Sequence, residues 1–259
     1  MYFLSVVLIG TVYPIFLDVI SSQKISVGPP FYHKLIIPFL IPFLFMMAIG
    51  PKLNWIKSQL EDKIYLISFL IISILLAFLV LKNFNQNILI NTILISSALY
   101  LFFITLRDFF VKKYKNISQN IAHFGFSLLI LSILFNNIFA SEIITNLKVG
   151  ETFENSKTKI VFESVDQKKE KNYNAIIANF FISNLNGEEE RFSPELRIYN
   201  QPIIATSEAD IKTTLMSDKF IVINLVQNQD FFNVRYQVKP FMLWIWLSVI
   251  LISFGGIVS

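Results

Sequence analysis

The sequence predicts an α-helical multispanning membrane protein of about six transmembrane helices, with a small all-β extracytoplasmic domain inserted before the last helix. Hydrophobic residues make up 54% of the 259 residues and charged residues only 15%, against about 25% in a soluble domain. Apolar runs recur through residues 1–140 and are long enough, at roughly 20 residues, to cross a bilayer. Residues 141–238 are more polar and alternate as strands do, and residues 239–259 are apolar again.

Five transmembrane helices are expected within residues 1–140, at about 2–20, 35–50, 64–81, 88–110 and 120–140. Gly28, Pro29 and Pro30 predict a non-helical loop before the second helix, because proline fixes φ and lacks an N–H group. Residues 239–259 are expected to form the final transmembrane helix. Trp244 and Trp246 near its start would lie at a membrane interface, where tryptophan is favoured.

The basic loops predict the orientation of the chain. Lysine and arginine are concentrated in residues 51–63 and 107–120, and the positive-inside rule places both loops inside. The alternation of spans then places both termini inside and the β domain, residues 141–238, outside.

Short alternating segments predict the strands of the β domain. The turn signal Asn186-Gly187 separates two of them and is typical of a type I′ hairpin. Glu188–Arg191, just after this turn, is expected to be a solvated strand start. A small sandwich or an open barrel fits strands of this length, expected at residues 157–165, 173–185, 188–199, 220–226 and 232–236.

The composition excludes several kinds of site. The chain has no cysteine and only two histidines, so disulfides, thiolate metal sites and a cysteine nucleophile are excluded. The net charge is +4, but the basic residues flank the predicted helices and do not line one surface. A nucleic-acid partner is therefore not expected, and no catalytic residue is assigned.

His123 is the main candidate, because an ionisable residue inside a membrane helix is costly unless it has a partner. The residues alone leave two interpretations open. The imidazole could reach headgroups or a backbone carbonyl at the interface, or it could be an axial ligand of haem iron. Gly125, two residues further on, is expected to leave room for a flat group.

Three other polar positions have simpler interpretations. His33 is expected to be a solvated or interfacial loop residue. Asp18 is expected at the interface, as a cap or a partner of Lys24, with a proton relay as the alternative. Arg107-Asp108 is expected to be an anchor pair at the inner membrane face.

Five motifs, in this order, resemble the C-terminal portion of CcmF, the haem lyase component of cytochrome c maturation system I. CcmF belongs to a superfamily of haem-handling proteins with CcmC and CcsA. The resemblance covers essentially the whole chain but only the C-terminal part of CcmF. The motifs are Ser26-Val-Gly-Pro-Pro-Phe-Tyr, Ala48-Ile-Gly-Pro-Lys, Ile121-Ala-His-Phe-Gly, Gly150-Glu-Thr-Phe and Val234-Arg-Tyr-Gln-Val-Lys-Pro-Phe-Met-Leu-Trp-Ile-Trp.

The resemblance implies a cofactor and a role for His123. His123 matches the family's Ala-His-x-Gly motif and would be an axial ligand of the iron of a membrane haem b. The second axial histidine lies upstream in the family and is not in this chain. The implied activity is covalent attachment of haem to apocytochrome c, and this piece alone is not expected to be active.

The resemblance also implies partners and a location. The partners would be the N-terminal part of CcmF, the haem chaperone CcmE, a CcmH-type thiol partner and apocytochrome c, within the lipid bilayer of a bacterial or mitochondrial inner membrane. One departure is Leu243, which stands where the family commonly has arginine. Two other function classes remain: a b-type haem electron-transfer subunit without ligation activity, and a membrane transporter or assembly scaffold.

Overall fold

The structure, a computed structural model, describes residues 1–21, 25–53, 63–82, 88–111, 116–184, 187, 189–225 and 230–258. The chain divides into two compact units. The first is Met1–Leu131 with Leu247–Ser259, and it is helical. The second is Ser132–Trp246, and it contains the strands.

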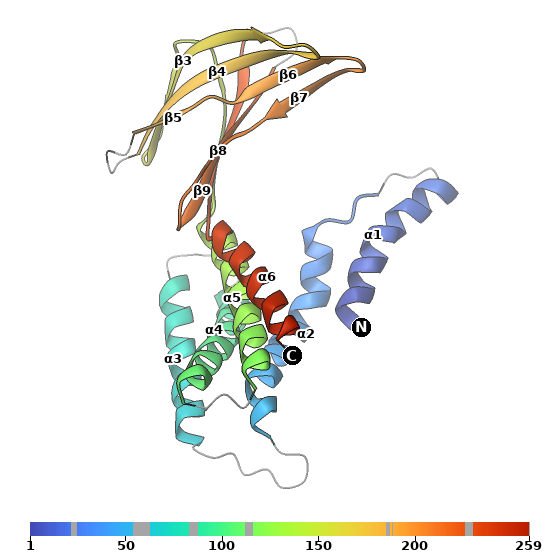
Figure 1. Cartoon of the computed structure of the whole chain (residues 1–259), viewed down its shortest axis with the longest axis vertical. Helices are drawn as coiled ribbons and strands as arrows, with labels where there is room; N and C mark the ends of the chain where they lie inside the picture. The colour runs from blue at the N-terminus through green and yellow to red at the C-terminus, as the bar shows by residue number, and fades with distance from the viewer. Residues whose placement is uncertain are drawn as a thin grey trace. The chain divides into compact units, whose positions relative to one another are not determined.

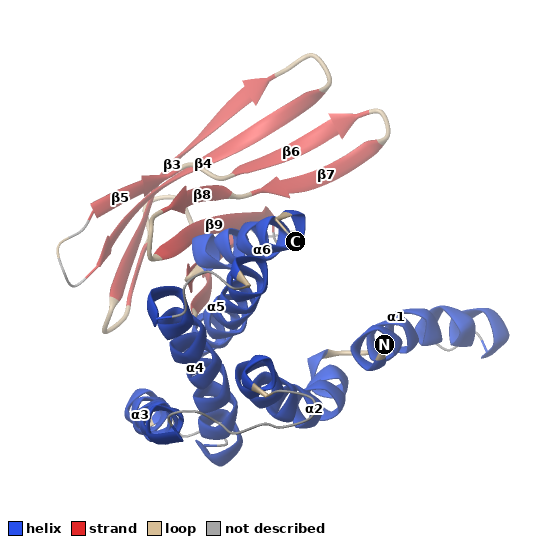
Figure 2. Ribbon diagram, turned by 60° about the horizontal axis from the view of Figure 1, so that its bottom comes forward, coloured by secondary structure: helices blue, strands red, loops and turns tan. Residues whose placement is uncertain are grey.

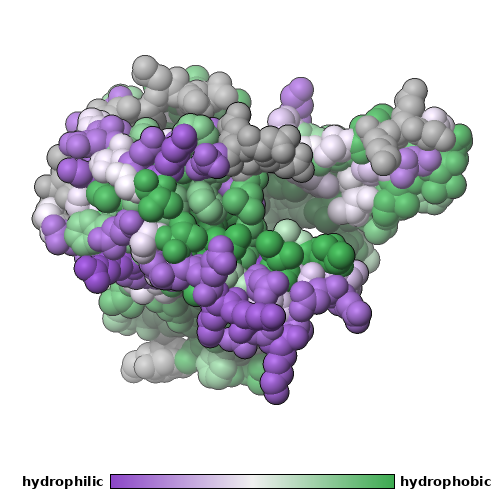
Figure 3. All heavy atoms as spheres, turned by 90° about the horizontal axis from the view of Figure 1, so that it is seen from above, coloured by the Kyte–Doolittle hydropathy of each residue, from purple (hydrophilic) through white to green (hydrophobic). Residues whose placement is uncertain are grey.

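The helical part confirms a multispanning membrane protein (Figure 1). Within the described residues, five helices are long and apolar enough to cross a membrane: α1 (Tyr2–Ser21), α2 (Pro29–Ile49), α3 (Lys63–Leu81), α4 (Ile88–Val111) and α5 (Ile117–Phe139). The last helix, α6 (Met242–Ile257), is apolar but has only 16 residues. Large apolar side chains are exposed along these helices, as expected where lipid is the solvent. Figure 3 shows hydrophobic surface beside hydrophilic surface on the face seen from above.

The second helix begins earlier than predicted. Pro29 and Pro30 were expected to lie in a loop, but they form the first turn of α2, after Gly28 as the N-cap. The first-turn N–H groups of a helix have no partner within the helix, so proline is tolerated there and its φ already suits the helix. The prolines therefore start this helix.

Helix α4 is the centre of the helical unit. It packs against both α2 and α3, and Figure 2 shows it between them. Its middle, from Leu94 to Leu101, is buried throughout. The hydroxyls of Ser97 and Thr105 donate to backbone carbonyls one turn earlier, at 2.8 Å in both cases, so these buried polar groups are satisfied within the helix.

The β domain is a sandwich of two sheets. One sheet has the strand order β1-β10-β9-β8, and the other has the order β2-β3-β4-β6-β7 with β5 paired to β4. All pairings are antiparallel. The strands are β1 (Ser141–Leu147), β2 (Thr152–Glu154), β3 (Thr158–Lys169), β4 (Tyr173–Asn184), β5 (Glu189–Phe192), β6 (Glu195–Asn200), β7 (Ile203–Glu208), β8 (Asp210–Thr213), β9 (Ser217–Leu225) and β10 (Phe232–Pro240).

Alternating apolar residues from both sheets fill the core of the sandwich. Ile160 and Phe162 of β3 are fully buried, as are Ile221 and Ile223 of β9. The rings of Phe162 and Phe180 stack with centroids 4.5 Å apart. The alternation that predicted these strands therefore places their apolar side chains on the inner faces.

One predicted strand is two strands in the structure. Residues 188–199 divide into β5 and β6 at Ser193-Pro194, because Pro194 has no N–H for a ladder. The gap is bridged in other ways: Ala178 N–H donates to the Pro194 carbonyl at 3.0 Å, and Ser193 N–H donates to Asp210 at 2.7 Å. Asn186 lies outside the described residues, while Gly187 has φ +76°, the left-handed region that favours glycine.

Candidate functional site

His123 lies on α5 and faces α2. The side chain is partly buried, and its ring hydrogen-bonds to the backbone of Met47, near the end of α2. The only backbone acceptor there is the carbonyl oxygen, so one ring nitrogen is the donor, and this bond does not use the other nitrogen. His123 can therefore donate to a backbone carbonyl and also be a metal ligand, so the two interpretations are compatible.

The sequence explains why the Met47 carbonyl can accept this bond. In an α-helix the carbonyl of residue 47 would accept from the N–H group of residue 51, and residue 51 is proline. Pro51 has no N–H, so the carbonyl of Met47 is left without its usual helical partner at the end of α2. This signal lies in the motif Ala48-Ile-Gly-Pro-Lys, yet the link to His123 is visible only in the structure.

Gly125 serves a different purpose from the one expected. It is buried, and a Cβ atom there would lie 3.0 Å from the backbone nitrogen of Ile252 in α6. The space beside Gly125 is therefore filled by a neighbouring helix. The prediction that it leaves room for a flat group was wrong, because the glycine allows α5 and α6 to approach closely.

Aromatic rings pack beside His123 on α5. The ring of Phe124 lies 5.1 Å from that of Phe102 and 5.7 Å from that of Phe109, both on α4. Three neighbouring residues of α5 thus face different helices: His123 faces α2, Phe124 faces α4 and Gly125 faces α6. The rotation of α5 about its axis, and so the direction of the imidazole, is fixed on three sides.

The other histidine cannot share an iron with His123. His33 is exposed near the start of α2, on the helix itself and not in the expected loop. It is 14 residues before Met47, roughly 21 Å along a helix. Among the residues that the structure describes, no group of three or more His, Cys, Asp or Glu side chains could hold a metal ion.

A buried charge cluster joins the ends of three helices. Asp108 of α4 pairs with Lys52, which follows α2 in the short 3₁₀ turn Gly50–Lys52. Arg107 lies further from Asp108, at 3.9 Å, and stacks 3.6 Å from the ring centroid of Tyr65 on α3. The sequence indicated Arg107-Asp108 as a pair, but the direct partner of Asp108 is Lys52. That pairing needs the fold, because 56 residues separate the two side chains.

The remaining polar candidates do not form a site. Asp18 is exposed on α1, and Lys24 lies outside the described residues. In the β domain Glu189 is exposed, as predicted for this strand start, but Glu190 is half-buried and pairs with Lys219 at 2.8 Å.

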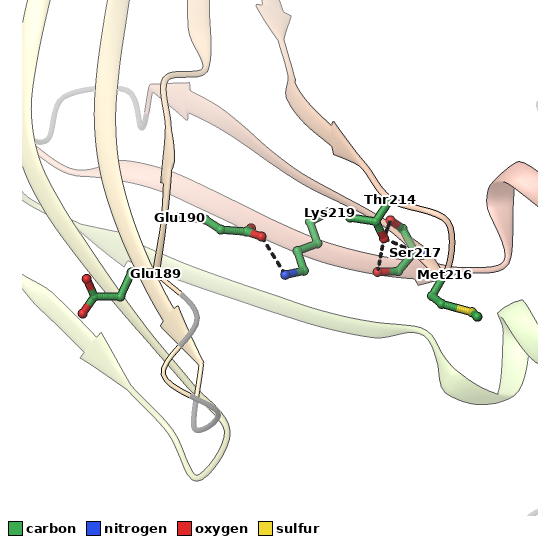
Figure 4. A pocket seen from close by; sticks show the side chains of 6 residues that line it. All are labelled: Glu189, Glu190, Thr214, Met216, Ser217 and Lys219. Carbon is green, nitrogen blue, oxygen red and sulfur yellow. Dashed lines mark hydrogen bonds and ion pairs between the residues drawn. The ribbon is translucent and has the colours of Figure 1, made fainter.

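Lys219 and Glu190 line a pocket of about 540 Å³ in the β domain. Figure 4 shows the two side chains pointing toward each other, with Glu189 pointing away and with Thr214, Met216 and Ser217 on the far side of Lys219. Lys219 is buried and its charge is neutralised by Glu190. The pair thus satisfies a lysine that would otherwise be costly to bury.

The chain is similar to known proteins along almost its whole length. A family model described as the CcmF C-terminal beta-sandwich matches residues 138–240. The cytochrome c-type biogenesis protein CcmF of Pseudomonas fluorescens is 25% identical, over 98% of this chain and 41% of the relative. The CcmF of Escherichia coli strain K12 is 23% identical, over 97% of this chain and 40% of the relative.

A solved structure has the same fold. The structure named Cytochrome c Heme Lyase CcmF matches with a TM-score of 0.72 at 19% identity, over 98% of this chain and 43% of that one. The chain thus spans about two fifths of the length of the curated relatives that it matches. In its β-sandwich and in the helices around it, this chain is thus similar to the C-terminal part of the CcmF proteins.

Proposed function

We propose that this chain supplies the C-terminal part of a cytochrome c haem lyase, with His123 as one axial ligand of a membrane haem b. The observation that carries the proposal is the contact between His123 and the Met47 carbonyl. Histidines that bind metals usually donate their other ring N–H to a carbonyl or a carboxylate, which fixes the ring and its tautomer. The donor set fits a haem that takes one ligand from this chain and one from elsewhere.

In this proposal a bound haem supplies one-electron redox chemistry, and the residues of the chain orient and shield the ligand. The carbonyl of Met47 would keep one ring nitrogen protonated and leave the other as the ligand of a bound haem. The aromatic rings that pack on Phe124 would help to hold α5 in the rotation that turns His123 toward α2. Burial and hydrogen bonding to the axial histidine both tune the reduction potential.

The proposed orientation places the β domain outside and both termini inside. It is supported by the basic residues in loops 51–63 and 107–120. The β domain would then meet apocytochrome c or a CcmH-type thiol partner, while haem would arrive through a CcmE-type chaperone. The second axial histidine would come from the N-terminal part of CcmF.

The test uses the two histidines of the chain as a matched pair. The chain is co-expressed with the N-terminal part of a CcmF protein, purified, and examined by optical spectroscopy. His123→Ala should reduce the bound haem b by at least fivefold, because an axial ligand is lost. His33→Ala should leave the spectrum unchanged, since that residue is exposed and far from Met47.

The amount of holocytochrome c formed in the same cells distinguishes the possible functions. Loss of both haem b and holocytochrome c in His123→Ala supports the proposed lyase. Loss of haem b with normal holocytochrome c would indicate an electron-transfer subunit. A wild-type assembly that contains no haem b would contradict the ligand role and favour a scaffold.

A further inference from the structure

The turn between β8 and β9 is attached to the first turn of α6. The backbone N–H of Phe241 donates to the carbonyl of Met216 at 2.8 Å, and the indole N–H of Trp244 donates to the carbonyl of Leu215 at 2.9 Å. Ser217 also pairs with Pro240 across the β9–β10 ladder. The turn is therefore held at the level of the start of α6.

The start of α6 lies beside the end of α5. The side-chain amide of Asn136 donates to the Pro240 carbonyl at 2.6 Å, and the rings of Phe135 and Phe241 are 5.7 Å apart. Helix α5 is long and apolar enough to cross a membrane and ends at Phe139. The attached turn is thus level with the end of a membrane-spanning helix.

The tip of this turn is apolar and exposed. Leu215 is 70% exposed and Met216 is 63% exposed, and residues 214–217 carry no charge. Large apolar side chains at a turn tip are unfavourable in water, because removing apolar surface from water is favourable. An apolar tip at this level indicates a lipid environment.

Charged residues begin directly beyond the tip. Thr213 pairs with Asp218, and Lys212 pairs with Lys219. At about 3.4 Å per residue along a strand, the uncharged tip extends on the order of 5–7 Å past Asp218. That length suits shallow burial at the boundary of headgroups and acyl chains, about 5–10 Å deep for interfacial segments.

We propose that residues 214–217 insert into the lipid headgroup region, with Leu215 and Met216 in contact with the bilayer. Trp244 links the start of α6 to this turn: its indole lies at the membrane interface in this proposal, and its N–H holds the turn. The partner is the lipid bilayer itself, since the exposed apolar tip is held level with the end of a helix that is long and apolar enough to cross a membrane. The β domain would thereby gain a second contact with the membrane, besides the connections of its chain to α5 and α6.

The test exploits the absence of cysteine from the chain. A bimane label is placed on Leu215→Cys or Met216→Cys, and the full chain is reconstituted in phosphatidylcholine nanodiscs that contain lipids spin-labelled at the headgroup or at acyl carbon 5. Ile203→Cys is the matched control, because Ile203 is apolar and 85% exposed on β7. The labels at 215 and 216 should be quenched by the lipids at least twofold more than the label at 203, and less by aqueous acrylamide.

The outcomes separate lipid from water and from protein. Equal lipid quenching at the three positions, with full access to acrylamide, would show that the tip lies in water. Protection from both quenchers when the N-terminal part of CcmF is co-reconstituted would show a protein contact. Either result overturns the proposal. Trp244→Phe removes the indole N–H that holds the turn, so it should reduce the lipid quenching at both tip positions.

Discussion

Gly255 of α6 lies directly against Ala122 of α5: a Cβ atom at position 255 would be 2.7 Å from the backbone nitrogen of Ala122. The same glycine accepts a hydrogen bond of 2.7 Å from the Ser118 hydroxyl through its carbonyl. Ala122 immediately precedes His123, so the contact that brings α6 against α5 also fixes the backbone that carries the candidate ligand. Close approach at a small residue is the usual basis of helix packing in membranes.

Replacing Gly255 by alanine should loosen this contact, and Gly256 provides the control. A methyl group at 255 meets backbone atoms that cannot move aside, whereas a Cβ at 256 has no heavy atom within 4 Å. Overpacking of this kind costs about 1–3 kcal/mol. Gly255→Ala should lower the melting temperature in detergent, and Gly256→Ala should not.

Equal melting temperatures for the two alanine variants would contradict the close α5–α6 packing. Where the assembly binds haem, Gly255→Ala should also alter the haem spectrum, because the backbone at His123 would shift. Gly256→Ala should retain the wild-type spectrum.

Removing Asp108 should destabilise the helical unit more than removing both members of its ion pair. The side chain of Lys52 is 6% exposed and that of Asp108 is 8% exposed. Breaking a buried pair leaves a buried charge and costs about 3–5 kcal/mol, while an apolar pair of similar size is often tolerated. Asp108→Leu should therefore unfold at a lower temperature than the double variant Lys52→Met with Asp108→Leu.

Lys34→Met is the control for the loss of a lysine, because Lys34 is exposed on α2. It should unfold at the wild-type temperature. A double variant less stable than Asp108→Leu alone would show that Lys52 stabilises the unit through contacts other than the ion pair.

The helices could be predicted from sequence because each is an apolar run bounded by polar residues. The start of α2 was missed since Pro29 and Pro30 read as helix breakers, although the first turn of a helix accepts them. The partners within the helical unit were also hidden: Lys52 and Asp108 meet across 56 residues, and no local pattern encodes such a pairing. Chemical type alone was enough to single out His123, but its acceptor is a backbone carbonyl, which has no signature of its own.

In the β domain, too, some elements could be predicted from the sequence and others could not. Strands β3, β4, β9 and β10 were predicted because one face of each is buried and apolar residues alternate along them. The strands β7 and β8 were not predicted: β7 carries two neighbouring isoleucines, Ile203 and Ile204, both exposed, so its apolar residues do not alternate with burial. Strand β1 is largely exposed and gives an equally weak pattern.

Glu142 should make the β1–β10 edge sensitive to acid. Side-chain hydrogen bonds from Gln237 and then Arg235 lower the pKa of Glu142 below its ordinary value of 4.5. Because the pKa in the folded state lies below that in the unfolded state, the stabilisation is present above pH 4.5 and is lost as the pH falls through the folded-state value. Glu142→Gln should remove this dependence, although the effect is small since the carboxylate is exposed.

Hydrogen exchange of the β1 amides in the full chain measures this effect, with wild type and variant compared at the same pH. Wild-type β1 should be better protected than the variant at pH 6, and the difference should shrink toward pH 3. Glu163→Gln, at another exposed carboxylate, is the control and should match wild type at both pH values. A difference for Glu142→Gln that grows as the pH falls would contradict the assigned hydrogen bonds.

Pro51 should act as a positioning residue for His123. Pro51→Ala would supply an N–H group that can bond to the Met47 carbonyl and complete the last turn of α2. The imidazole would then compete for its acceptor, so the ring would be less firmly oriented. In the assembly with the N-terminal part of CcmF, the haem should remain bound, with a shifted reduction potential and a broadened spectrum, because hydrogen bonding to the axial histidine tunes the metal.

Pro38→Ala is the control, since Pro38 also lies in α2 but is nine residues before Met47, and it should leave the potential unchanged. An unchanged potential in Pro51→Ala would show that the missing N–H of Pro51 has no part in holding the ring, whereas complete loss of haem would show that the proline is needed for folding of the helix end itself.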